Sequence, residues 1–284
     1  MSTVLQQNPA SQPPTIEILP PRRGISLDLG DLWRYRELLY FLTWRDIKVR
    51  YKQTALGVAW ALLQPLLTTV LFTLIFGYFL ELPSGGVPYP VFTLTALLPW
   101  QLFAYALNHS SQSLVEDRNL ITKIYFPRLI IPFSSVSAGL LDFAIGLIFL
   151  LVMMLVYRVP LTWQVLALPG LVAYAVLAAL SVGLWLSALN VQYRDVRYTL
   201  PFLTQFWMYA TPIAYSAAII PEGWRWLACL NPMTGVVEGF RWALLGIPSP
   251  LGGLLWISVV VVIVLLVSGL YYFKRMEERF ADVI

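Results

Sequence analysis

The feature that most constrains this chain is a series of long apolar runs with almost no charged residues. Six such runs alternate with short segments that hold most of the charge. A helix needs about 20 apolar residues to cross the roughly 30 Å hydrocarbon core of a bilayer, and each run is long enough. The predicted spans are residues 57–80, 91–114, 129–157, 165–189, 200–220 and 251–273.

Helices are the expected form of these spans. Backbone amides in lipid must form hydrogen bonds within their own segment, and the runs lack the alternation of polar and apolar residues that marks barrel strands. Apolar residues make up 58% of the chain and charged residues 12%, whereas about 45–50% apolar residues is typical of soluble domains. We therefore expect an all-α polytopic membrane protein with six transmembrane helices.

The positions of Lys and Arg predict the orientation of the spans, because cytoplasmic loops are enriched in positive charge. With both termini placed in the cytoplasm, 16 of the 19 Lys and Arg residues fall on the cytoplasmic side. The other three are Arg158, Arg225 and Arg241. This imbalance also accounts for the net charge of +4 without a nucleic-acid partner.

Two segments precede the first span. Residues 1–30 are rich in Pro and polar residues and are expected to be a flexible cytoplasmic tail. Residues 31–55 are expected to be an amphipathic helix in the headgroup layer, serving either as a simple anchor or as a docking element for a partner. The apolar face consists of Leu32, Tyr35, Leu39 and Leu42. The cationic face consists of Arg34, Arg45, Lys48 and Lys52.

The outer segment between the fifth and sixth spans is too apolar for an ordinary loop but is broken into two short pieces. One piece covers residues 222–230, and the other covers 232–245 after Asn231 and Pro232, a pair typical of a helix start. Neither piece can cross a bilayer, so we expect a re-entrant helical hairpin. Glu238 and Arg241, three residues apart, are expected to form an ion pair on the second helix.

The loop between the second and third spans, residues 117–127, is expected to contain a short helix that ends at Pro127. In this helix Leu120 with Ile124, and Ile121 with Tyr125, would form an apolar stripe. The residues alone leave two interpretations open, a connector on the membrane surface or a docking site for another protein.

Four blocks of the sequence resemble the ABC-2 type permeases that export polysaccharides and polyol phosphates, including the O-antigen type. They are DIKVRYKQTALGVAWALLQPL, NLITKIYFPRLIIP, LSALNVQYRDVRYTLPFLTQFW and NPMTGVVEGFRWALLG, and they occur in the family's order. The resemblance implies a channel made with a second copy of the chain and driven by two cytoplasmic ATPase subunits. It also implies that residues 222–246 are gate helices. The coupling residues toward the ATPase would be Asn119, Leu120, Ile121, Lys123, Ile124, Tyr125 and Phe126.

Cofactor binding within this chain is not expected. The sequence contains no Gly-x-x-x-x-Gly-Lys-Ser/Thr motif to hold phosphates, so ATP and magnesium are expected on the partner subunit, and the chain itself is not expected to be an enzyme. One cysteine, Cys229, and one histidine, His109, offer no metal-ligand cluster, and both are expected to be packing residues.

The third span contains a lone acidic residue, Asp142. An intramembrane carboxylate is a candidate proton or substrate site. The favoured interpretation is structural, with Asp142 protonated or bonded to Ser and Thr on neighbouring helices.

Aromatic residues are abundant, with 11 Trp, 15 Tyr and 15 Phe. Many are expected to lie at the two membrane interfaces, but spans two and five and the gate region hold an excess that could stack on sugar rings. The residues predicted for the translocation pathway and gate are Trp100, Phe103, Tyr105, Trp207, Tyr209, Tyr215, Trp224, Trp226, Glu238, Arg241 and Trp242.

The sequence therefore predicts an inner-membrane permease that exports a cell-surface glycan, with membrane lipids around it. Two rival functions share parts of this pattern. One is an ABC-2 exporter of a small drug or lipid, and the other is an ion-coupled carrier or channel. Composition does not separate the three.

Overall fold

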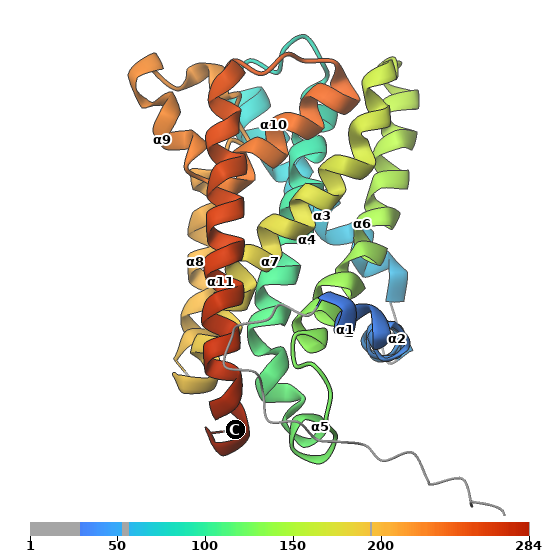
Figure 1. Ribbon diagram of the computed structural model, residues 1–284. Helices are drawn as coiled ribbons and strands as arrows, with labels where there is room; N and C mark the ends of the chain where they lie inside the picture. Colours follow the sequence, from blue (N-terminus) through green and yellow to red (C-terminus); the bar gives the residue numbers. More distant parts are fainter. Residues whose placement is uncertain (1–28, 53–56, 194, 284) are drawn as a thin grey trace, which may run out of the picture.

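The computed structural model describes residues 29–52, 57–193 and 195–283, and every regular element in these ranges is a helix. The predicted all-α class is confirmed, and Figure 1 shows a bundle of long, roughly upright helices. The tail predicted for residues 1–30 lies outside the described residues except for its last two, which belong to the first helix.

Five helical segments in the described ranges are long and apolar enough to cross a membrane: residues 59–79, 89–116, 130–156, 163–192 and 252–277. The helices that form them are α3 (Gly57–Phe72) with the π-helical turn Thr73–Phe79, α4 (Tyr89–Glu116), α6 (Ile130–Val156), α7 (Leu168–Gln192) with the 3₁₀ turn Trp163–Ala167, and α11 (Leu255–Val283). They match five of the six predicted spans.

Helix α4 is the axis of the bundle. In its most apolar stretch 78% of the residues are buried, compared with 17% in the first and last spans. Helices α6 and α7 pack against α4 along its length, and α10 (Pro232–Leu245) packs on its upper part. The other spans present apolar side chains outward, as expected where lipid covers the protein.

The fifth predicted span is the exception. Its helix, α8 (Val196–Ala210), has 15 residues and is about 22 Å long at 1.5 Å per residue. Thr211 has an extended backbone and precedes Pro212, which disfavours helical geometry at the residue before it. The continuous helix expected over residues 200–220 is therefore wrong. After a short irregular stretch, residues 217–219 form a 3₁₀ turn.

Six shorter elements complete the described chain. Their bounds are α1 (Leu29–Arg34), α2 (Arg36–Lys52), α5 (Arg118–Lys123), the 3₁₀ turn Glu222–Trp224, α9 (Arg225–Cys229) and the 3₁₀ turn Gly252–Leu254. In Figure 1, α2 lies across the lower part of the bundle and α5 lies at its lower end, whereas α9 and α10 lie toward the upper end.

One face of α2 packs against α6, and the side chain of Leu32, which the predicted apolar face also includes, lies outside the described residues. Leu42 is buried, and Tyr35 and Leu39 are half-buried, in one cluster with Ile121 and Phe126. The opposite face is not purely cationic, because it also exposes aromatic side chains. These are Tyr40, Phe41 and Trp44.

The C-terminal helix α11 is longer than the predicted last span. It continues to Val283 through most of the segment predicted as a tail, residues 276–284. Phe280, near its end, is fully buried against Phe273 with a ring-centroid distance of 5.3 Å. This packing explains why the helix extends beyond the apolar run.

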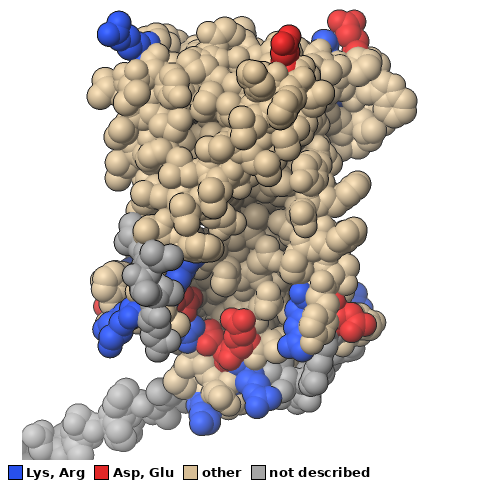
Figure 2. Space-filling model, turned by 180° about the vertical axis from the view of Figure 1, so that it is seen from behind, with Lys and Arg blue, Asp and Glu red and all other residues tan. Residues whose placement is uncertain are grey.

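Charged side chains gather at the lower end of the molecule, where α5 and the end of α11 lie, and a broad uncharged belt separates them from a few charges at the top (Figure 2). This is the distribution expected of a protein whose middle lies in hydrocarbon.

Candidate functional site

The loop between α4 and α6 forms an exposed apolar tip at the charged end of the bundle. Helix α5 ends at Lys123, and Ile124 has an extended backbone with φ −131° and ψ 136°. The Tyr125 side chain is 96% exposed and that of Ile124 is 57% exposed. Asn119 and Lys123 are also exposed, and Leu120 is half-buried. Five of the seven predicted coupling residues thus lie on one small protruding surface: Asn119, Leu120, Lys123, Ile124 and Tyr125.

The helix predicted over Leu120–Phe126 is wrong in its second half. Phe126 and Ile121 are buried in the same apolar cluster as Leu42. Because the chain leaves the helix after Lys123, Phe126 points into this cluster while Tyr125 points away from it. The expected stripe is therefore split into a buried part and an exposed part.

Both ends of this loop are tied to other elements by arginines. Arg45 of α2 donates two hydrogen bonds to Asp117, with Nη1–Oδ1 at 2.8 Å and Nη2–Oδ2 at 2.7 Å. At the other end Arg128 donates through its backbone N–H to Glu277 Oε1 at 3.2 Å, and through its guanidinium to the Glu277 carbonyl. A bidentate arginine pair fixes orientation as well as distance, so the loop has a defined orientation relative to the bundle.

The charges around Arg45 stabilise its protonated form. The hydrogen bonds with Asp117 raise the pKa of Arg45 above its ordinary value. Asp46 also accepts from Arg45, with Nε–Oδ1 at 3.0 Å. Burial nevertheless raises the pKa of Asp46, because the charged carboxylate loses water. Arg45 therefore stays protonated at neutral pH.

A cavity of about 500 Å³ lies beside α4 and is also lined by α3 and α6. Polar and aromatic side chains line much of it. They include Arg50, Trp60, Gln64, Trp100, Gln101, Tyr105, Asn108, His109 and Asp142. Only Trp100, Tyr105 and Asp142 are among the predicted site residues. The amides were missed because single Gln and Asn residues in apolar runs give no periodic signal, and His109, expected to pack in the core, is exposed.

Asp142 is held by residues of α2. Arg50 Nη1 lies 2.6 Å from Asp142 Oδ2, and the Tyr51 hydroxyl donates to Oδ1. The expected Ser and Thr partners are therefore wrong. Arg50 also lies over the Tyr105 ring at 4.4 Å, and the Tyr105 and His109 rings are 4.1 Å apart. An ion pair and two stacked rings thus form part of the cavity wall.

The expected ion pair between Glu238 and Arg241 is confirmed. Glu238 and Arg241 are both buried, with Oε1 and Nη1 3.1 Å apart. Arg241 also donates to the carbonyl groups of Ile213 and Tyr215, at 2.8 Å and 3.3 Å, and covers the Phe92 ring at 3.8 Å. Arg241 therefore links α10 to the non-helical segment that follows α8.

The start of α10 is fixed as the sequence predicts. Asn231 Oδ1 accepts from the Met233 N–H at 3.0 Å, which caps the helix, and also from Trp207 Nε1 at 2.9 Å. Asn231 Nδ2 donates to Thr211 Oγ1 at 2.8 Å. At the other end Gly246 has φ +68° in the left-handed region that ends helices.

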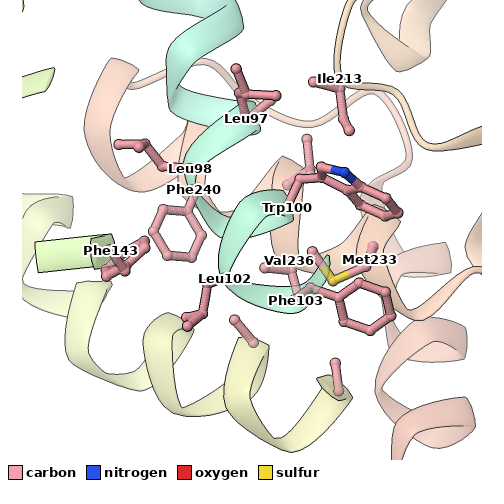
Figure 3. Packing of buried hydrophobic residues seen from close by; sticks show 14 of the residues in the cluster. Leu97, Leu98, Trp100, Leu102, Phe103, Phe143, Ile213, Met233, Val236 and Phe240 are labelled. Atoms are coloured by element: carbon pink, nitrogen blue, oxygen red, sulfur yellow. The ribbon is translucent and has the colours of Figure 1, made fainter. Parts of the chain in front are cut away.

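The predicted pathway aromatics do not gather in one place. Trp100 and Phe103 are buried in the core, where they lie near Met233 and Val236 (Figure 3). Trp207 packs on Phe103 with a centroid distance of 5.2 Å. The other predicted residues lie toward the surface: Tyr209, Trp224 and Trp226 are exposed, and Tyr215 and Trp242 are half-buried.

Among the described residues, no group of three or more His, Cys, Asp and Glu side chains is placed to hold a metal ion. Three features of the structure bear on its function. They are an exposed loop tip at the charged end, a polar and aromatic cavity beside α4, and a hairpin at the opposite end.

Comparison with known proteins identifies the family of this chain. Residues 37–245 match the family model described as ABC-2 type transporter. The O-antigen export system permease protein RfbA of Klebsiella pneumoniae is 32% identical, over 87% of this chain and 95% of its own length. RfbA of Myxococcus xanthus is 29% identical, over 89% of this chain and 98% of its own length. The polysialic acid transport protein KpsM of Escherichia coli is 26% identical, over 82% of this chain and 91% of its own length.

Proposed function

Since the chain belongs to the family of ABC-2 type transporters, we propose that it is the membrane subunit of an ATP-driven exporter of cell-surface polysaccharide. It works as a pair with a second copy of itself in the bacterial inner membrane. Two cytoplasmic ATPase subunits bind ATP and magnesium and supply the energy. The names of the relatives, an O-antigen export system permease and a polysialic acid transport protein, support this class of substrate.

The observation that carries the proposal is the exposed tip of the loop between α4 and α6. Tyr125 is almost fully exposed and Ile124 is more than half exposed, at the end of the molecule where charge gathers. An apolar tip in water is unfavourable unless a partner covers it. The ATPase subunit is that partner, and this loop transmits the movement of the ATPase to the membrane subunit.

The layout in the membrane follows from the charge distribution. Both termini and the loop tip are cytoplasmic, and the α9–α10 hairpin enters from the outer face. The sixth crossing consists of α8 together with the irregular segment that Arg241 holds against α10. Helices α1 and α2 lie in the cytoplasmic headgroup layer, where exposed Trp33 of α1 and Trp44 of α2 contact lipid.

The glycan passes along the face of the bundle that carries the cavity. Flat aromatic rings and amide groups suit sugars, because rings stack on C–H faces while amides bind hydroxyl groups. Trp60, Tyr105 and Gln101 offer both kinds of contact in the cavity. At the outer end Trp224 and Trp226 close the pathway at rest and stack on sugar when it opens.

The coupling role is tested by replacing Ile124 and Tyr125 with Asp. Because both side chains are exposed, the double variant should insert and fold normally. We expect it to lose co-purification with the ATPase subunit and to lose glycan export. Tyr198→Asp, at an exposed tyrosine outside the coupling residues, serves as a control and should keep both activities. If the double variant still binds the ATPase and exports glycan, the loop is a connector and the proposed coupling is wrong.

A further inference from the structure

Helix α2 carries two arginines whose carboxylate partners lie in different functional parts of the molecule. Arg45 makes its bidentate pair with Asp117, which is the N-cap residue of α5 at the base of the loop tip. Arg50 pairs with Asp142 at 2.6 Å in the wall of the cavity. The two arginines are five residues apart, which is about 7.5 Å along the helix axis. One short stretch of helix therefore joins the loop to the cavity.

Apolar packing also holds the loop and α2 together, three residues before Arg45. Leu42 of α2, Ile121 of α5 and Phe126 of the tip belong to one buried cluster. Leu42 and Ile121 are each 6% exposed and Phe126 is 5% exposed. A displacement of the loop cannot leave α2 in place without opening this cluster, because packed side chains do not slide past one another freely.

The Arg45 pair fixes the direction of the movement that α2 would follow. A fork of two parallel hydrogen bonds resists rotation of Asp117 about the guanidinium, which a single contact would allow. Asp117 is also the last-turn cap of α4, where its N–H donates to the Ser113 carbonyl at 3.0 Å. A push on the tip therefore acts at a hinge between α4 and α5, and α2 is attached to that hinge.

We propose that α2 is a rigid link that transmits movement of the coupling loop to the cavity, with Arg45 as the positioning residue at the loop and Arg50 at the cavity wall. This inference rests on the proposed function. The link acts by moving Arg50, which lies over Tyr105, whenever the ATPase moves the loop. The position of Arg50 in the cavity wall then changes each time ATP is bound and released.

The test exchanges the charges of the loop pair in the complete complex with its ATPase subunits. Variants Arg45→Asp and Asp117→Arg each break the pair. The double variant Arg45→Asp with Asp117→Arg restores an ion pair in which the two charges have exchanged positions. Lys48→Gln is the matched control, because it removes one positive charge from the exposed side of α2 between the two arginines. ATPase co-purification, ATP hydrolysis and glycan export are measured for each.

We expect both single variants to assemble with the ATPase and hydrolyse ATP, while glycan exported per ATP falls about fivefold or more. The charge-swapped double variant should recover most of this ratio, and Lys48→Gln should match the unmodified protein. A purely structural pair would instead change the amount of assembled complex and leave the ratio constant. An unchanged ratio in the single variants, or a charge swap that assembles normally without recovery, overturns the proposal.

A milder variant covers the case in which the single charge changes prevent folding. Arg45→Lys keeps the positive charge but cannot form the two-pronged pair, so it should fold and show a ratio between those of the unmodified protein and the single variants. An unchanged ratio for Arg45→Lys would also contradict the link. If the unmodified chain captures no ATPase subunit and supports no export, the proposed function fails, which is a separate result from failure of the link.

Discussion

At the scale of single residues, arginines hold three carboxylates against the helical bundle. Asp117 pairs with Arg45, Asp142 with Arg50, and Glu238 with Arg241. Only the last pair lies within one helix, and only that pair was predicted from spacing. The partners of Asp117 and Asp142 come from α2: Arg45 is 72 residues from Asp117 in the chain, and Tyr51, next to Arg50, is 91 residues from Asp142. No local pattern marks such a pairing, which is why the sequence suggested Ser and Thr neighbours for Asp142.

The Arg50–Asp142 pair predicts a characteristic result for paired substitutions. Asp142 is only 20% exposed, so Arg50→Gln, which leaves its carboxylate without the guanidinium, should lower the free energy of unfolding by about 1–3 kcal/mol. Arg50 is 39% exposed, so Asp142→Asn should cost less, about 1 kcal/mol or below. The double variant leaves no unpaired charge and should be more stable than the sum of the single effects predicts. Thermal unfolding of the purified protein in detergent measures all four forms.

Additive effects in that cycle would contradict a direct interaction between the two side chains. Arg36→Gln on the exposed side of the same helix is the control. Arg36 contacts Trp33 by a hydrogen bond to its carbonyl at 3.3 Å and by a ring contact at 5.5 Å, far from the cavity. Its replacement should change stability by less than about 0.5 kcal/mol.

At the scale of the elements, sequence predicted the presence of helices better than their ends. The start of α10 at Asn231–Pro232 and its end at Gly246 were predicted because each residue has a local stereochemical role. The end of α8 was missed because residues 211–220 are apolar enough to continue a span. Tertiary contacts decide their shape instead, since Arg241 binds the carbonyl groups of Ile213 and Tyr215.

The cap of α10 gives a second stability prediction. Asn231→Ala removes the hydrogen bonds to Met233, Trp207 and Thr211, so we expect a loss of about 1–2 kcal/mol. Asn231→Ser keeps a capping oxygen and should recover part of that loss. Chemical denaturation in detergent, followed by tryptophan fluorescence, measures both variants. Equal stability of the Ala variant and the unmodified protein would show that the cap does not hold the hairpin.

At the scale of the whole molecule, the sequence predicted the all-helical class and five of the long helices, because apolar length and charge asymmetry are properties of the chain itself. It did not predict the cavity beside α4, since that wall combines α3, α4 and α6 with Arg50 of α2. It also placed both Trp100 and Phe103 in the pathway, whereas only Trp100 lines the cavity and Phe103 is buried in the core. Aromatic residues in a core and in a pathway look alike in sequence.

The whole-molecule account links these parts in one order. In the proposed cycle the ATPase contacts the loop tip at Tyr125, the loop moves α2, and α2 moves Arg50 at the cavity. At the opposite end, Arg241 keeps the hairpin and the segment after α8 together. An export cycle therefore needs the ATPase, the loop and the cavity face in a single assembly.

The most direct test of this account is surface display of polysaccharide in the bacterium that encodes the chain. The chain is deleted and then restored together with either an active ATPase subunit or one that binds but cannot hydrolyse ATP, and antibody labelling measures the glycan outside the cell. We predict surface glycan only when the chain and the active ATPase are both present, with glycan accumulating inside the cell otherwise. Normal surface glycan without the chain, or with the inactive ATPase, would contradict the account.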